Sequence, residues 1–197
     1  MIRGKYLWNA GRLLTLLVGY SLLPGCAVAI VGGVTVGTVA VNNQRTLGAT
    51  VEDQQIESSA RKLARTNKAV AEGNHLNFIS YNRVLLITGE VRKESTKAQL
   101  DNIMRTIPNL RRIHNELTVA APSSTLSRTS DTYLTAKVKT RLLMEKQLNA
   151  NHFKVVSENG RVYLLGLCSR KEGAQAALVA RKTSGVQSVT TLFEYIN

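Results

Sequence analysis

The chain repeats itself, and this repeat limits what its 197 residues can fold into more than any other feature. Two segments recur at an offset of 78: Arg83-Val84-Leu85-Leu86-Ile87 matches Arg161-Val162-Tyr163-Leu164-Leu165, and Arg92-Lys93-Glu94 matches Arg170-Lys171-Glu172. Gly89 and Gly166 match at an offset of 77, so the turn after this strand differs by one residue. Similarity at a fixed period indicates an internal duplication.

Hydrophobic periodicity predicts the order α-β-β-α-β in each copy. In the first copy it predicts a helix that begins after Asp53 as N-cap and stops by Gly73, a second helix over 94–107, and strands over 76–81, 84–87 and 112–119. In the second it predicts helices over 131–144 and 169–183 and strands over 152–158, 161–167 and 186–196. The hairpin turns fall at Asn82-Arg83 and at Asn159-Gly160, and the second is a strong signal because both positions need positive φ. Residues 121–129 have the composition of a linker.

The first 25 residues have the order of a secretory signal. Three basic residues precede an apolar run over residues 13–23, which is about half the length that a stable bilayer crossing needs. The run ends in Leu23-Pro24-Gly25-Cys26, which resembles a bacterial lipobox. This resemblance implies cleavage before Cys26 and acylation of its thiol with chains such as palmitate. The alternative is an ordinary signal peptide, with Cys26 as a structural thiol.

Residues 26–50 would then form an acylated leader, which is apolar and glycine-rich as far as residue 41. The apolar part is either a strand-like segment that packs on the domain or a slack leader near the lipid, and we favour the leader. Ala27 follows the cysteine, and a non-acidic residue there implies, by resemblance to bacterial lipoproteins, onward export. We therefore expect a lipid-anchored protein of the outer membrane that faces the periplasm.

The chain carries a formal charge of +13. Residues 1–25 hold three of the basic residues and no acidic one, so the remainder keeps +10. We expect no nucleic-acid partner, because an exported protein rarely meets nucleic acid and no basic stretch is interleaved with aromatic residues. Anionic lipid headgroups are the better candidate.

No pattern in the sequence predicts catalysis or metal binding. Cys26 and Cys168 cannot form a disulfide if the first carries lipid, and the position of Cys168, which matches Val91, favours a small buried side chain. The three histidines have no Cys or His at ligand spacing beside them. The sequence also lacks a nucleophile elbow, a Walker loop and a zincin helix. We therefore expect no enzyme activity, no metal, no cofactor and no small-molecule substrate.

The repeated Val-x-Leu-x-Gly strand, followed by a helix and the closing strand Gly185-Val186-Gln187-Ser188-Val189, resembles the BON domain of bacterial envelope proteins. Two such modules behind a lipobox resemble the dual-BON outer-membrane lipoprotein family. The resemblance implies an α+β fold of two tandem BON modules, each with a small mixed three-stranded sheet packed on two helices. The modules would span 51–120 and 130–197, joined by the linker 121–129. The first module departs further, with Asn109-Leu110 where the second has Ser184-Gly185.

The helix predicted over residues 131–144 carries the candidate site. An apolar stripe of Leu134, Val138 and Leu142 should contact the sheet, and a second stripe of aromatic, basic and apolar groups lies beside it. The predicted site residues are Tyr133, Lys137, Lys139, Arg141, Leu143 and Met144. An interfacial helix needs such groups, since apolar parts enter the headgroup boundary while cations reach phosphate. From the residues alone, a solvated helix face is an equally good interpretation.

The resemblance decides between these two interpretations, because in dual-BON lipoproteins the first helix of the second module is the phospholipid-binding surface. It implies anionic phospholipid, such as phosphatidylglycerol or cardiolipin, as the partner, and a role in envelope integrity, cell division and septal peptidoglycan remodelling. The first helix of the first module offers Arg61, Lys62 and Arg65 but no aromatic residue, so we expect it to be a structural partner. The alternative function is a protein adaptor whose basic face docks an acidic protein of the division or secretion machinery.

Overall fold

The structure is a computed structural model that describes residues 46–196. The predictions for the signal peptide, for acylation of Cys26 and for the leader as far as residue 45 lie outside the described residues. Within residues 46–196, no helix combines the length and the apolar character that crossing a bilayer requires.

The first described helix, α3, spans Leu47–Thr66 and begins earlier than predicted. Its N-cap is Thr46, whose hydroxyl oxygen accepts a hydrogen bond from Ala49 N at 3.1 Å. The prediction that Asp53 is the N-cap is wrong, because Asp53 is buried inside the helix and its carboxylate faces the sheet. The last residues assigned to the leader, 47–50, are therefore helical.

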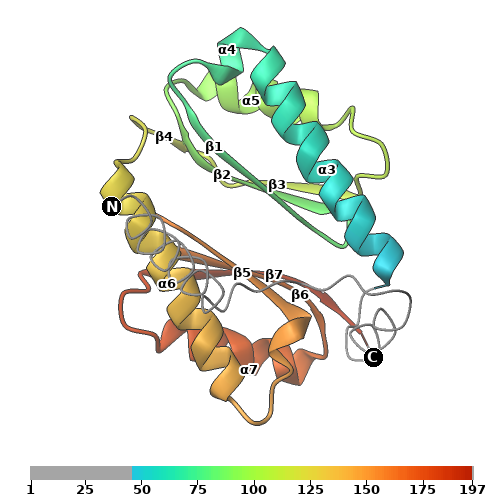
Figure 1. Cartoon of the computed structure of the whole chain (residues 1–197), viewed down its shortest axis with the longest axis vertical. Helices are drawn as coiled ribbons and strands as arrows, with labels where there is room; N and C mark the ends of the chain where they lie inside the picture. The colour runs from blue at the N-terminus through green and yellow to red at the C-terminus, as the bar shows by residue number, and fades with distance from the viewer. Residues whose placement is uncertain (1–45, 197) are drawn as a thin grey trace, which may run out of the picture. The chain divides into compact units, whose positions relative to one another are not determined.

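The first copy builds its elements in the predicted order (Figure 1). After α3 come α4 (Lys68–Ala71), β1 (His75–Tyr81), β2 (Val84–Val91), α5 (Glu94–Met104), β3 (Arg112–Asn115) and β4 (Thr118–Val119). The strand predicted over 112–119 is thus broken after Asn115, whose side chain donates to Lys97 O on α5 and accepts from Leu117 N. β2 also continues beyond Gly89, which remains paired with β1 at a φ of 118°.

The second copy has the same order of elements. They are α6 (Thr125–Met144), the short 3-10 helix η1 (Ala150–His152), β5 (Phe153–Glu158), β6 (Arg161–Cys168), α7 (Arg170–Arg181) and β7 (Ser188–Tyr195). Helix α6 begins before its predicted start at Asp131, because the Ser124 hydroxyl oxygen accepts a hydrogen bond from Ser127 N at 3.2 Å and caps the helix. The second half of the predicted linker, residues 125–129, is therefore helical.

Each copy forms a small mixed sheet covered by helices, which confirms the predicted α+β fold class. In the first sheet β1 pairs antiparallel with β2, and β3 and β4 pair parallel with β2. In the second sheet β5 pairs antiparallel with β6, and β7 pairs parallel with β6. Because β4 also joins it, the first sheet has four strands where three were expected.

The sheet faces that the helices leave open pack against each other. Side chains alternate along a strand, so Leu85 and Ile87 lie in the core beneath the helices while Leu86 points to the other sheet. The apolar cluster between the sheets consists of Ile79, Tyr81, Leu86, Val156, Tyr163 and Leu165. The Tyr81 hydroxyl also donates to the carbonyl of His152 at 2.7 Å. The two modules are therefore joined by a buried interface.

The register of the hairpins corrects the predicted alignment of the two copies. The turns Asn82-Arg83 and Asn159-Gly160 are equivalent, since all four residues have positive φ, and they match at an offset of 77. Leu86 therefore corresponds to Tyr163, and both lie between the sheets. The sequence alignment at an offset of 78 would match residues of β2 with residues of β6 that lie on the opposite face of the sheet, because a shift of one residue along a strand exchanges its two faces.

One buried aspartate in each module fixes the first helix to the hairpin. Asp53 accepts hydrogen bonds from both backbone N–H groups of Asn82-Arg83, each at 2.8 Å. Asp131 accepts those of Asn159-Gly160, at 2.8 and 2.9 Å. A carboxylate in this position satisfies N–H groups of the turn that strand pairing leaves free, and its charge strengthens both bonds. The same contact sets the position of α6 and of everything that it exposes.

Candidate functional site

Helix α6 contacts the rest of its module through one face. Its buried residues are Asp131, Leu134, Val138 and Leu142. At an offset of 78 they match the buried residues of α3, which are Asp53, Ile56, Ala60 and Ala64. The remaining circumference of α6 is open to solvent or borders shallow cavities.

The six predicted site residues all lie outside this buried face. Tyr133 and Leu143 are each 68% exposed, and Met144 is 75% exposed. Lys139 and Arg141 are also exposed, while Lys137 is half-buried. Large apolar side chains are seldom left in water without a role when they gather in one place, so this helix is the leading candidate surface.

The structure divides these residues between two flanks of α6. Tyr133, Lys137, Arg141 and Met144 lie on the flank that faces α7 and the turn after it; we call these four residues the α7 flank. The other two, Lys139 and Leu143, line a small cavity of about 270 Å³ beside β5. The predicted stripe is therefore not continuous around the outside of the helix.

The cations of the α7 flank are held by backbone carbonyls. Lys137 Nζ donates to the Ser184 carbonyl at 3.0 Å and to its hydroxyl oxygen at 2.5 Å. Arg141 Nη1 donates to the Lys182 carbonyl at 2.7 Å. These bonds use two of the three donors of the ammonium group and one of the five of the guanidinium. Both cations are thus positioned in advance and keep donors for an anion.

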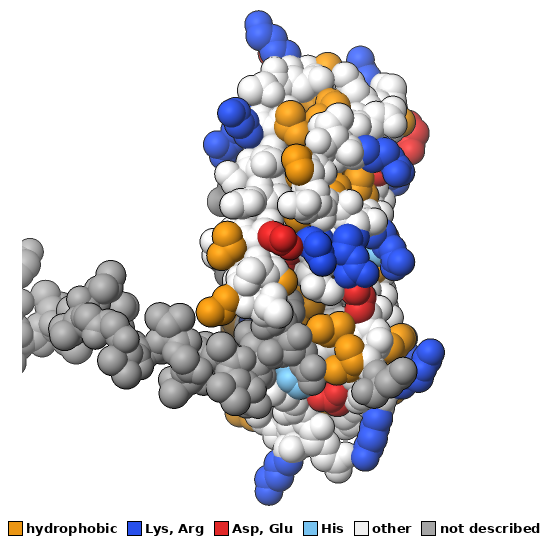
Figure 2. All heavy atoms as spheres, turned by 90° about the vertical axis from the view of Figure 1, so that its right-hand side faces the viewer, with side chains coloured by type: hydrophobic (Ala, Val, Ile, Leu, Met, Phe, Trp, Pro, Cys, Tyr) orange, Lys and Arg blue, Asp and Glu red, His pale blue; other side chains and the backbone are white. Residues whose placement is uncertain are grey.

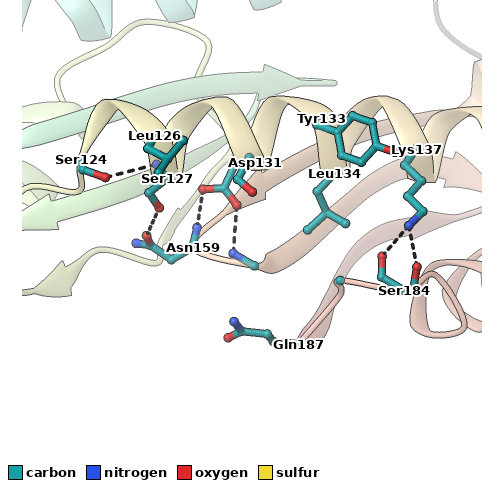
Figure 3. Close-up of a pocket in the computed structure, with 13 residues that line it drawn as sticks. Ser124, Leu126, Ser127, Asp131, Tyr133, Leu134, Lys137, Asn159, Ser184 and Gln187 are labelled. Atoms are coloured by element: carbon teal, nitrogen blue, oxygen red, sulfur yellow. Dashed lines mark hydrogen bonds between the residues drawn. The ribbon is translucent and has the colours of Figure 1, made fainter.

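A cavity of about 820 Å³ opens beside Tyr133 and Lys137 (Figure 3). Lys137 Nζ lies 6.0 Å from the centroid of the Tyr133 ring, at the limit of a cation–π contact. Leu126, which is 81% exposed, borders the same cavity. Four serines bring hydroxyl groups to it: Ser124, Ser127, Ser130 and Ser184. A cation beside hydroxyl groups and an aromatic ring can hold a small anionic group that carries polar substituents.

The outward side of α6 is rich in threonine, and the hydroxyl groups there are already paired. Thr129, Thr132 and Thr140 each donate to the carbonyl four residues earlier, at 2.9 to 3.0 Å. A hydroxyl that is satisfied within its own helix costs less to move into apolar surroundings than a free one. This side of the helix can therefore approach an apolar boundary despite its polar composition.

Helix α6 exposes positive charge without negative charge. Its basic residues are Arg128, Lys137, Lys139 and Arg141. Its one acidic residue, Asp131, is buried against the turn. On the face of the molecule drawn in Figure 2, by contrast, acidic side chains lie directly beside basic ones. An anion that approaches α6 meets no exposed carboxylate of this helix.

Sequence reasoning missed the residues at the start of α6, among them Leu126, Ser127 and Ser130. The serines and threonines of this stretch resembled a linker, and the helix start was placed too late. The repeat held the missing signal, because Ser124 lies 78 residues after Thr46, and both are N-caps. Ser184, which comes from the turn after α7, carries no such signal.

Cys168 is fully buried at the end of β6, which confirms the prediction of a small buried side chain. Burial, with a smaller contribution from Glu172, raises the pKa of its thiol to about 11. The thiolate is the reactive form of cysteine, so this residue is inert at neutral pH.

Comparison with known proteins agrees with this architecture of paired α/β modules. The BON domain family matches residues 52–121 and 130–197. The chain belongs to the BON-domain family, and with its two copies to the dual-BON outer-membrane lipoproteins, as the sequence predicted.

Two curated relatives are similar to most of the chain. The outer membrane lipoprotein DolP of Haemophilus influenzae is 30% identical over 185 residues, which cover 93% of this chain and 96% of the relative. The 21 kDa hemolysin of Actinobacillus pleuropneumoniae is 26% identical over 152 residues, which cover 77% and 78%. Domain and relatives point to a non-enzymatic binding protein of the outer membrane.

Solved structures add little to this assignment. The C-terminal domain of CdsD, a structural protein of the type III secretion system of Chlamydia trachomatis, is 14% identical with a TM-score of 0.29, over 74% of this chain and 67% of that chain. A second CdsD structure is 11% identical with a TM-score of 0.30, over 71% and 91%. Scores this low carry no argument about function.

Proposed function

We propose that α6 is a membrane-binding surface that recognises anionic phospholipid, such as phosphatidylglycerol or cardiolipin. The observation that carries the proposal is the α7 flank, where a tyrosine, a lysine, an arginine and a methionine lie together on a helix with no exposed acidic residue. Lys137 and Arg141 suit the phosphate, while Tyr133 and Met144 suit the boundary between headgroups and acyl chains. The hydroxyl-lined cavity beside Lys137 suits the polar part of a headgroup.

The magnitude of this contact fits an orienting role. Each basic group near an anionic surface contributes about 1 kcal/mol, so Lys137, Lys139 and Arg141 contribute about 3 kcal/mol before any apolar insertion. Such binding is weak and reversible for a free protein. A protein already tethered to the same membrane gains from it, because the second contact becomes intramolecular.

The tether that we propose is acylation at Cys26, in an outer-membrane protein that faces the periplasm. Support comes from the lipobox-like sequence before Cys26 and from the similarity to an outer membrane lipoprotein. Two or three acyl chains hold a protein firmly at a bilayer, since each buried CH2 adds about 0.8 kcal/mol. In this arrangement the anchor supplies the affinity and α6 selects the lipid.

The cellular role that we propose is support of envelope integrity and of septal peptidoglycan remodelling during division. Its support is the resemblance to the dual-BON lipoprotein family. Lipid selection by α6 would place the protein where anionic lipid is enriched.

The test uses a chain that begins at Ala27, which keeps every described residue and lacks the acylated cysteine. Vesicles of phosphatidylglycerol should bind this chain, and vesicles of phosphatidylcholine should not. The double variant Lys137→Glu with Arg141→Glu should lose at least about 100-fold in affinity, because two favourable charges become two unfavourable ones. Vesicle co-sedimentation at 0.15 M salt measures the effect.

The matched control is Lys62→Glu with Arg65→Glu on α3, which changes the net charge equally. The control should lose less than about threefold, since charges beyond a Debye length of the bilayer are screened. Equal losses in both double variants would show that only total charge matters. Unchanged binding of the α6 variant would remove the site and favour the adaptor hypothesis, in which the same cations dock an acidic protein.

A further inference from the structure

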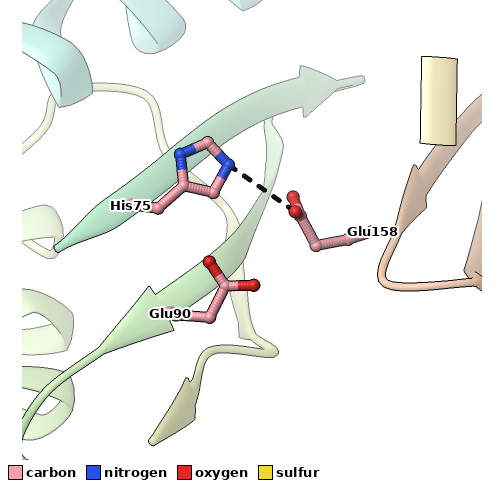
Figure 4. A group of neighbouring side chains, drawn as sticks. All are labelled: His75, Glu90 and Glu158. Carbon is pink, nitrogen blue, oxygen red and sulfur yellow. Dashed lines mark ion pairs between the residues drawn. The ribbon is translucent and has the colours of Figure 1, made fainter. Parts of the chain in front are cut away.

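One histidine and two glutamates meet where the two modules pack together. His75 and Glu90 are direct partners across β1 and β2, and Glu158 is the last residue of β5. One ligand atom of each lies within 4.8 Å of the others, and His75 Nε2 is 3.6 Å from Glu158 Oε1 (Figure 4). The glutamates are 2% and 7% exposed. Sequence spacing could not show this cluster, because its members come from three strands of both modules.

Because the fold is duplicated, the interface contains a second position that is equivalent to this cluster, and the residues there can be compared with it. At the hairpin offset of 77, the residues that correspond to His75, Glu90 and Glu158 are His152, Leu167 and Tyr81. There the Tyr81 hydroxyl donates to the carbonyl of His152 at 2.7 Å, and none of the three residues is acidic. The sheets therefore pack at that position without a buried carboxylate. The two carboxylates at the other position require a reason other than packing.

Neutral groups hold both carboxylates in place. Thr88 Oγ1 donates to Glu158 Oε2 at 3.0 Å, and Ser123 N donates to Glu90 Oε2 at 3.1 Å. The side-chain amide of Asn159 donates to Glu90 Oε1. Such bonds orient the oxygens, but they leave two buried negative charges to be balanced, and burying unbalanced charge is costly.

Two cations that line the groove beside this cluster form their hydrogen bonds with other groups. Arg128 and Lys154 line the same groove as His75 and Glu158. The guanidinium of Arg128 donates to the Ser123 carbonyl at 2.8 Å, and the ammonium of Lys154 lies 3.0 Å from Glu57. A half-buried imidazole therefore faces two carboxylates that, within residues 46–196, form no ion pair with a lysine or an arginine.

We propose that His75, Glu90 and Glu158 bind a divalent transition-metal ion, Zn²⁺, which joins the two modules. One neutral imidazole and two carboxylates balance the charge of such an ion, and this donor set suits zinc with water as the fourth ligand. The hydrogen bonds from Thr88, Ser123 and Asn159 are the outer contacts that usually orient carboxylate ligands.

The geometry requires only side-chain movement. Ligand atoms around tetrahedral zinc lie about 3.4 Å apart, given bonds of 2.0 to 2.1 Å. The three side chains end in rotatable groups, so rotation closes the remaining distance without moving a strand. A groove of about 480 Å³ lined by His75 and Glu158 provides the entry path.

The experiment titrates ZnCl₂ into the untagged full chain, purified in detergent and stripped of metal with a chelator. Calorimetry should show one ion bound per chain, and zinc should raise the melting temperature, since an ion that binds only the folded state stabilises it. His75→Gln and Glu158→Gln should each weaken zinc binding at least about tenfold. His75→Gln changes a half-buried residue at the edge of a sheet, so it should fold even if the other variant does not.

The matched control is His114→Gln, which removes a half-buried histidine from β3 of the same sheet and should leave zinc binding unchanged. MgCl₂ should neither bind at the same concentration nor raise the melting temperature. Equal zinc affinity in the wild type and in His75→Gln would overturn the proposal. So would the absence of zinc binding to the wild type, or equal binding of magnesium; the cluster would then be a hydrogen-bonded ion pair.

Discussion

The first helices of the two modules share a buried face and differ in what they expose. Both α3 and α6 have 20 residues, begin after a hydroxyl N-cap and bury an aspartate at the same position. Where α6 has Tyr133 and Lys137, α3 has Gln55 and Ser59. The two helices therefore have equivalent buried faces and different exposed surfaces.

The charges of the two helices also differ. In α3, Glu57 pairs with Arg61 at 2.9 Å and reaches Lys154 of the second module at 3.0 Å, while Glu52 lies 3.4 Å from Arg83. The exposed side of α3 thus carries acidic groups that pair with cations, one of them its own Arg61, whereas α6 exposes cations alone. The buried half of such a helix fixes where it lies, and the exposed half is free to acquire a ligand.

We expect the largest loss of stability from substituting the buried aspartate that each of the two helices has at the equivalent position. Asp53→Ala and Asp131→Ala should each lower the free energy of unfolding by about 3 kcal/mol, because each removes a buried carboxylate that accepts two charge-assisted hydrogen bonds from half-buried N–H groups of a turn. Asp53 should cost more, since it also accepts from Ser80 Oγ at 2.6 Å. Urea denaturation measures both. Asp101→Ala, which removes a surface ion pair with Arg105, is the control and should cost less than about 1 kcal/mol; equal losses in all three would refute the shared role.

The next effect tests whether the α6 surface can be moved. Gln55→Tyr with Ser59→Lys should give α3 the ring and the cation of α6 at equivalent positions. In a chain whose own site is disabled by Lys137→Glu with Arg141→Glu, this change should restore part of the binding to phosphatidylglycerol vesicles, by about fivefold for one added cation. Gln55→Tyr alone is the control for the ring. No gain from the pair would mean that the cavity beside α6 matters more than the stripe.

The smallest effect concerns Glu57, whose position in α6 is taken by the non-titrating Thr135. Burial acts to raise the pKa of Glu57, but the Ser80 N–H and the charge of Lys154 outweigh it and hold the pKa below its ordinary value. Because the pKa of Glu57 is lower in the folded state, ionised Glu57 stabilises the fold at neutral pH. This contribution to the free energy of unfolding is lost as the pH falls below about 4.5 and through the folded-state pKa. Between pH 5 and pH 3, Glu57→Gln should therefore lose less unfolding free energy than the wild type, by under about 1 kcal/mol. Lys154→Met should reduce the pH dependence in the same direction, and identical pH profiles in all three proteins would contradict the assignment.

The order of elements could be predicted because local signals carry it. Alternating strands, helical periodicity and the Asn159-Gly160 turn are visible within short windows of sequence, and the repeat supports each assignment twice. The buried and exposed faces of α6 follow from the same periodicity. These features therefore needed no knowledge of tertiary contacts.

The parts that could not be predicted depend on partners far along the chain. Asp53 has the chemistry of an N-cap, yet its carboxylate binds turn residues almost thirty positions later. Asn115, after which the predicted strand is broken, similarly bonds to Lys97, which lies on another element. The division of the site into two flanks depends on the carbonyls of the turn after α7. The cluster of His75, Glu90 and Glu158 exists only because two sheets meet.

The packing of sheet on sheet has a consequence for any attempt to divide the chain. A module expressed by itself would expose the greasy face that carries Ile79, Tyr81 and Leu86, or its counterpart in the other copy. The isolated module should aggregate or form a homodimer through this face. In the intact chain the second module is covalently linked and therefore present at high effective concentration, so each module covers the apolar face of the other. The solvent-exposed residues of either module can then change without loss of solubility, because its apolar sheet face stays buried against the other module.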